Sequence, residues 1–149
     1  MTITPDPDVR RAPRHLWVIG VAALLWNAMG AFDFVMTQTR NEAYMSSFTP
    51  EQLAFFYGFP AWLIVVWAVG VWGGVLGALL LLLRRRQAPS LFLASLMAMT
   101  ITTFQNYVLS NGAAVIGDAF SIGFTAVIFI IGFALLLYAR AMRKRGILR

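Results

Sequence analysis

The chain has 149 residues, of which 60% are hydrophobic and 12% are charged, and its formal net charge is +6. A soluble domain of this length has about a quarter of its residues charged, so the composition indicates a membrane protein with no sizeable soluble domain. The sequence holds no cysteine, which excludes disulfide bonds, thiolate zinc sites, iron–sulfur clusters and cysteine nucleophiles. Its basic residues flank apolar segments, which favours anionic lipid headgroups as partners and argues against nucleic acid.

The first predicted span covers residues 16–36 and follows a basic arm, residues 1–15. Its length is sufficient to cross a hydrocarbon core of about 30 Å. A basic arm, an apolar segment and then small residues also match a secretory signal peptide, so cleavage near Gly30 is the alternative. The apolar segment continues past Gly30, which favours a retained span.

The longest polar connection, residues 37–58, contains a predicted short helix at about residues 50–57. Thr49 is placed to be its N-cap, Pro50 its first helical residue and Gln52 the capping-box partner. Because aromatic residues fill this helix, we expect it to lie at the headgroup boundary. An ordinary capped loop helix fits the same residues.

Three further spans are predicted, at residues 59–83, 89–109 and 119–139. A basic loop (84–88) and a periplasmic turn (110–118), in which Asp118 can cap the last helix, separate them, and a basic tail (140–149) follows. The predicted fold is therefore an all-α bundle of four transmembrane helices that forms one membrane domain.

The basic residues also predict the orientation of this bundle. With four spans, the arm, the 84–88 loop and the tail share one side and hold three, three and five basic residues, whereas the other side holds only Arg40. The positive-inside rule therefore places both termini in the cytoplasm and the 37–58 loop in the periplasm.

Small residues form a stripe along each of the first two spans, because positions three, four and seven apart share a helix face. The predicted helix-packing residues are Gly20, Ala23, Asn27 and Gly30 on the first span and Gly70, Gly73, Gly74 and Gly77 on the second. We expect the two stripes to pack on each other, with Asn27 as a hydrogen-bonding group between helices. Self-association of two chains through the glycine face is the alternative.

Asp33 is the charged residue that lies clearly within a span, about one turn from its end. Such a carboxylate needs compensation, and Thr37 or Arg40 are the partners that helical spacing suggests. The same carboxylate is the centre of a predicted solute site in the periplasmic half of the bundle. The candidate substrate-binding residues are Asp33, Tyr57, Thr103, Asn106 and Thr125.

Reactive motifs give no support to an enzyme. His15 stands alone among arginines, so we expect no metal site. A P-loop, a dinucleotide-binding glycine pattern and a nucleophile elbow are all missing from the sequence. We therefore expect no catalytic residues and no cofactor.

Three segments carry a resemblance to known proteins: residues 26–33 (WNAMGAFD), 48–53 (FTPEQL) and 56–62 (FYGFPAW). With the glycine stripe and the arginines at 84–86, they resemble a family of small, uncharacterised four-span bacterial inner-membrane proteins, some of which are labelled "sugar transporter". The resemblance covers nearly the whole chain and implies the bacterial cytoplasmic membrane and solute transport. In size the chain is also distantly similar to small multidrug-resistance transporters, but its aspartate near the rim and its long outer loop argue against proton-coupled antiport.

Two functions are consistent with these features. The first is binding or transport of a small polar, sugar-like solute through the outer pocket around Asp33. The second is a non-enzymatic structural or auxiliary role, with a second copy of the chain or another membrane protein as partner.

Overall fold

The structure, a computed structural model, describes residues 11–149, so most of the expected basic arm, including Arg10, lies outside the described residues. The helices are α1 (Arg14–Gln38), α2 (Glu42–Met45), α3 (Pro50–Tyr57), α4 (Ala61–Leu82), α5 (Ala88–Phe104), the π-helical turn η1 (Gln105–Leu109), α6 (Ala113–Ile116) and α7 (Ala119–Lys144). Four segments are long and apolar enough to cross a membrane, namely α1, α4, α5 continued by η1, and α7. This confirms the prediction of an all-α chain with four candidate spans.

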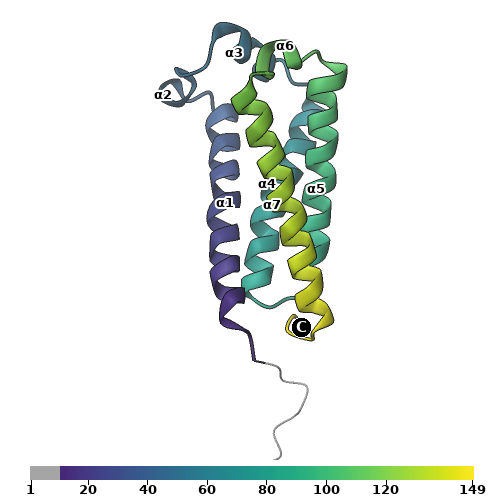
Figure 1. Cartoon of the computed structure of the whole chain (residues 1–149). Helices are drawn as coiled ribbons and strands as arrows, with labels where there is room; N and C mark the ends of the chain where they lie inside the picture. Colours follow the sequence, from purple (N-terminus) through teal and green to yellow (C-terminus); the bar gives the residue numbers. More distant parts are fainter. Residues whose placement is uncertain (1–10) are drawn as a thin grey trace, which may run out of the picture.

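The four long helices run alternately up and down and form one bundle (Figure 1). They pack in series, α1 against α4, α4 against α5 and α5 against α7. The short helices α2, α3 and α6 lie together at one end of the bundle, and the C-terminus lies at the other (Figure 1). The shared core clusters near this second end and includes Leu16, Leu81, Ala139 and Met142.

Both predicted helix caps are confirmed. The Thr49 hydroxyl accepts the N–H of Gln52 at 3.2 Å, and the Thr49 N–H donates to the Gln52 side chain at 3.1 Å, which completes the capping box of α3. The Asp118 carboxylate accepts the N–H of Ser121 at 3.1 Å at the start of α7. These caps satisfy helix N–H groups that have no partner within the helix.

The C-terminal ends of the four long helical segments share a backbone motif that the sequence does not reveal. A residue with positive φ follows the last turn, and the N–H after it donates back across that turn, as from Asn41 to the Met36 carbonyl at 3.0 Å. The residues with positive φ are Arg40, Arg84, Asn111 and Gly146. Glycine is the usual residue here, because other side chains clash in this conformation. Only Gly146 follows that preference.

The glycine stripe of α4 packs differently from the prediction. A Cβ atom added at Gly70, Gly73 or Gly77 would contact side chains of α5, and only Gly74 faces α1, through Asn27. The small residues of α1 instead face large side chains of α4, such as Leu82 opposite Gly20. The glycine face of α4 thus receives side chains of α5 such as Met99 and Phe92, and Gly20 of α1 receives Leu82 of α4. The glycine face is covered within one chain.

Gly74→Ala is expected to destabilise the bundle by about 1–3 kcal/mol, because the added methyl group overlaps the Asn27 side chain. Gly123→Ala is the matched control: its Cβ meets nothing within 4 Å, and alanine adds roughly 0.5–1 kcal/mol of helix propensity. Detergent-induced unfolding in mixed micelles, followed by far-ultraviolet circular dichroism, measures both effects. Unchanged stability of Gly74→Ala would contradict this packing, and adding Asn27→Ala should recover part of the loss.

Candidate functional site

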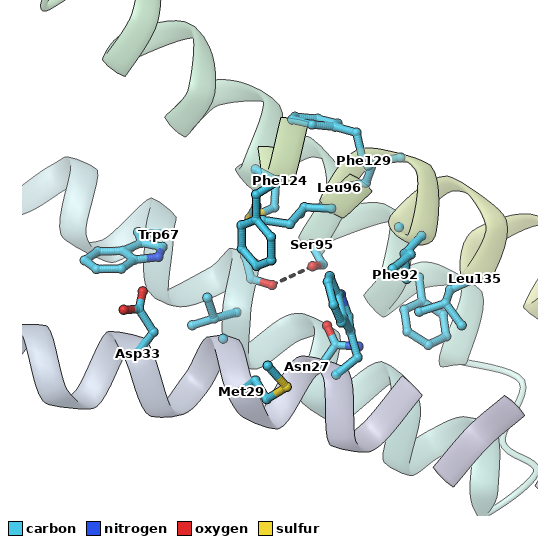
Figure 2. Close-up of a pocket in the computed structure, with 18 of the residues that line it drawn as sticks. Asn27, Met29, Asp33, Trp67, Phe92, Ser95, Leu96, Phe124, Phe129 and Leu135 are labelled. Carbon is cyan, nitrogen blue, oxygen red and sulfur yellow. Dashed lines mark hydrogen bonds between the residues drawn. The ribbon is translucent and has the colours of Figure 1, made fainter. Parts of the chain in front are cut away.

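A cavity of about 490 Å³ lies among α1, α4, α5 and α7 (Figure 2). Aromatic side chains form much of its wall: Trp26, Tyr44, Phe48, Trp67, Phe92, Phe120, Phe124 and Phe129. The polar side chains that reach it are Asn27, Asp33, Ser95 and the Tyr44 hydroxyl. The site is therefore a largely apolar chamber with a few polar groups, one of them a carboxylate.

The cavity lies in the half of the bundle where α7 packs less closely on its neighbouring helices. The buried residues of α7 are Leu135, Leu136, Ala139 and Met142, all in the half near the C-terminus. In the other half, the Trp26 and Phe124 rings, with centroids 5.9 Å apart, link α1 to α7 beside the open space. The bundle is thus tightly packed at the basic end and hollow toward the end that carries α2 and α3.

Asp33 points from α1 into the bundle, beside Trp67 (Figure 2). Its Oδ1 atom accepts a hydrogen bond from the Tyr44 hydroxyl, which comes from α2, at 2.5 Å. Neither partner suggested by helical spacing takes this role: Thr37 is buried, and the Arg40 guanidinium lies over the Tyr57 ring, 4.2 Å from its centroid. The loop after α1 therefore folds back and supplies the compensating donor from eleven residues away.

Tyr44 is held firmly in front of Asp33. The Asn41 side chain caps α2 by accepting the Tyr44 N–H at 3.1 Å, and the Phe32 ring meets the phenol edge-on. Burial, then the hydrogen bond to Asp33 and the negative charge of that carboxylate, together raise the pKa of the Tyr44 phenol to about 12. The phenol therefore stays protonated, and able to donate a hydrogen bond, throughout the physiological pH range.

Asn27 and Ser95 use their polar groups to hold helices. The Asn27 amide donates to the Ala23 carbonyl of its own helix at 2.8 Å, so its contact with α4 is close packing on Gly74. The hydrogen bond between helices comes instead from Ser95 of α5, whose hydroxyl donates to the Gly70 carbonyl of α4 at 2.5 Å (Figure 2). This bond ties the two helices together at the glycine face and lies at the cavity wall.

Of the five predicted substrate-binding residues, Asp33 lines the cavity and the other four do not. Tyr57 stacks under Arg40, and the Thr125 hydroxyl donates to the Ser121 carbonyl of α7. Thr103 is half-buried away from the cavity, and the buried side-chain amide oxygen of Asn106 (Oδ1) has no hydrogen-bond partner in the described part of the chain. For Asn106 the reason is the π-helical turn Gln105–Leu109, which changes the face that this residue occupies and which regular helix spacing cannot anticipate.

Sequence reasoning missed Tyr44 and the aromatic walls of the cavity. Trp67 and Phe124 look like ordinary apolar residues of a span, and no local pattern links Tyr44 to Asp33. The usable signal was the lone carboxylate itself, since a buried acid needs a donor and the following loop is the nearest source.

The Tyr44 phenol is expected to ionise near pH 12, whereas an exposed phenol ionises near 10.0. Because its pKa is higher in the folded chain, the stability from this contact is fully present below about pH 10 and is lost as pH rises toward 12. Phenolate absorbance of the wild type minus that of Tyr44→Phe isolates this titration. Asp33→Asn should lower the Tyr44 pKa only partly, since burial, the largest cause, remains; an ordinary pKa in the wild type would contradict the contact.

Comparisons with protein-family models, with curated proteins and with solved structures gave no match to this chain. The resemblance to small bacterial inner-membrane proteins therefore stays a prediction. The cavity and the Asp33–Tyr44 pair are the features from which a function can be argued.

Proposed function

We propose that this protein binds a small amphipathic molecule in the membrane-embedded cavity, as a transporter or solute receptor. The observation that carries the proposal is the cavity itself, about 490 Å³ in volume, with the Asp33 carboxylate in its wall. This volume lies within the range of about 300–1,000 Å³ typical of small-molecule sites. The cavity also has the composition of such sites, an apolar chamber with a few placed polar groups.

The composition of the wall modifies the expected solute. A sugar presents hydroxyl groups on every side, and an aromatic and aliphatic wall leaves most of them without hydrogen bonds, which costs about 1–3 kcal/mol for each group. A molecule with an apolar body and one polar head matches the wall better. Trp26, Trp67 and Phe124 would contact the body, and Asp33 would receive the head.

The surroundings of Asp33 indicate the charge of the ligand's polar head. Among the described residues no lysine or arginine lies within ion-pair distance of this carboxylate, and Tyr44 is its hydrogen-bond donor. The nearest basic residue in the outer loop, Arg40, is placed over Tyr57. A cationic head would supply the missing positive charge and would also be attracted by the faces of the surrounding aromatic rings. We therefore propose an organic cation as ligand.

In the proposed orientation, the Asp33 end of the cavity faces the periplasm of a bacterial cell and the basic end faces the cytoplasm. The distribution of basic residues supports this placement. Helix α3, with its aromatic side chains, would then lie at the outer headgroup boundary.

Binding of 4-phenylbutyl-trimethylammonium to the purified chain in micelles tests the proposal. Quenching of tryptophan fluorescence reports occupancy, because Trp26 and Trp67 line the cavity. We expect saturable binding of this cation, weaker binding of its uncharged tert-butyl analogue and no binding of glucose. Asp33→Asn should weaken cation binding by about 1.5–3 kcal/mol, the usual contribution of a hydrogen bond to a charged group, and should leave the uncharged analogue nearly unaffected.

Glu51→Gln is the matched control, because it removes an exposed carboxylate of α3 that does not line the cavity. Equal losses in Asp33→Asn and Glu51→Gln would reduce the effect to general surface charge and refute a specific site. Saturable binding of glucose would contradict the cation as ligand and support the sugar-like solute expected from the sequence. No binding of any probe by a chain with a wild-type circular dichroism spectrum would favour the auxiliary role.

A further inference from the structure

The basic end of the bundle contains a second built feature, formed by two segments far apart in the sequence. Residues 147–149 fold back against the turn that follows α4: the Arg149 N–H donates to the Arg84 carbonyl at 2.6 Å, and the Arg86 N–H donates to the Arg149 carbonyl at 2.9 Å. The Arg84 Nε atom donates to the Ile147 carbonyl at 3.0 Å. Ile147 and Leu148 are buried in the core, so this segment is fixed in place.

This arrangement surrounds a hollow of about 300 Å³ lined by Leu83, Arg84, Arg85 and Arg149. Three arginines therefore border one small space, and no aspartate or glutamate side chain of the described chain lines it. In residues 11–149 the side chains of Arg85 and Arg149 make no hydrogen bond or ion pair. Arg85 and Arg149 border the same hollow, so a bound anion would relieve the repulsion between their like charges.

We infer that this hollow binds the phosphate group of an anionic phospholipid. Arginine forks match the oxygens of a phosphate group through paired hydrogen bonds, and several arginines around one space can hold all of its oxygens. Leu83, which is 66% exposed at the end of a span, places apolar surface directly beside the charges. A phospholipid has a matching arrangement at the membrane boundary, with its apolar chains directly beside its phosphate group. This site is independent of the cavity around Asp33.

The test uses the full chain in micelles doped with phosphatidylglycerol or phosphatidylcholine, with bound lipid counted by native mass spectrometry. The wild type is expected to retain phosphatidylglycerol in preference to phosphatidylcholine. The double variant Arg85→Gln/Arg149→Gln should weaken this retention by at least ~10-fold, because it removes two phosphate-binding forks. Arg84 is left unchanged, since its Nε atom holds the 147–149 segment.

The matched control is Arg140→Gln/Lys144→Gln, which removes two exposed positive charges from the same end of the bundle without altering the hollow. Retention in the control should change by less than ~3-fold, a difference of under about 0.7 kcal/mol. Equal losses in the two double variants would overturn the inference, because they would show diffuse attraction to the basic end. Wild-type retention in Arg85→Gln/Arg149→Gln would overturn it as well.

Two further arms identify the ligand and guard against misfolding. Competition by inorganic phosphate at concentrations comparable to the lipid would overturn the lipid as ligand, whereas resistance to it supports a headgroup site. Arg85→Lys keeps the charge and removes the planar fork, so a several-fold loss of phosphatidylglycerol in a chain with wild-type unfolding behaviour supports the site. No loss in Arg85→Lys together with a folding defect in the double variant would refute it.

Discussion

The close approach of α4 and α5 along the glycine face is the constraint on which the rest of the bundle depends. Without side chains at Gly70, Gly73 and Gly77, α5 lies near enough for Ser95 to donate a hydrogen bond to a backbone carbonyl of α4. In a lipid environment such packing and hydrogen bonding, rather than the exclusion of water, hold helices together. Helix α4 packs its glycine face on α5 and contacts α1 through Gly74 and Val71, so it lies at the centre of the bundle. Helix α7 packs mainly on α5 and lies at the margin.

The cavity is the consequence of that marginal position. Helix α7 packs on α5 and buries its side chains in the basic half, where the main core also includes Leu16 and Leu81. In the other half the large rings of Trp26 and Phe124 meet without filling the space behind them. Asp33 and Tyr44 lie in this less tightly packed half. The unequal packing of the two halves therefore leaves the cavity open beside these polar groups.

The sequence predicted the four spans and the caps at Thr49 and Asp118 because these follow from local rules, namely apolar length and side-chain oxygens before a helix. It predicted Asp33 as the centre of a site because a carboxylate among apolar residues is conspicuous. The partner of Asp33, the facing of the glycines and the aromatic wall depend on how the helices pack, and spacing along one helix carries no such information. The backbone conformation at the helix ends could not be predicted either, because Arg40, Arg84 and Asn111 have the positive φ angles that are usual for glycine.

The buried residues of α7 lie toward its C-terminal end, so this helix is anchored in the core at that end. The portion from Leu135 to Met142 contains the four buried residues of α7, whereas no residue from Ala119 to Gly132 is buried. A small tilt about the anchored portion displaces the other end most, and it separates Phe124 from Trp26 without disturbing the contacts of α4 with α1 or α5. If the cavity binds the proposed amphipathic cation, this gap would admit it directly from the acyl-chain region of the bilayer.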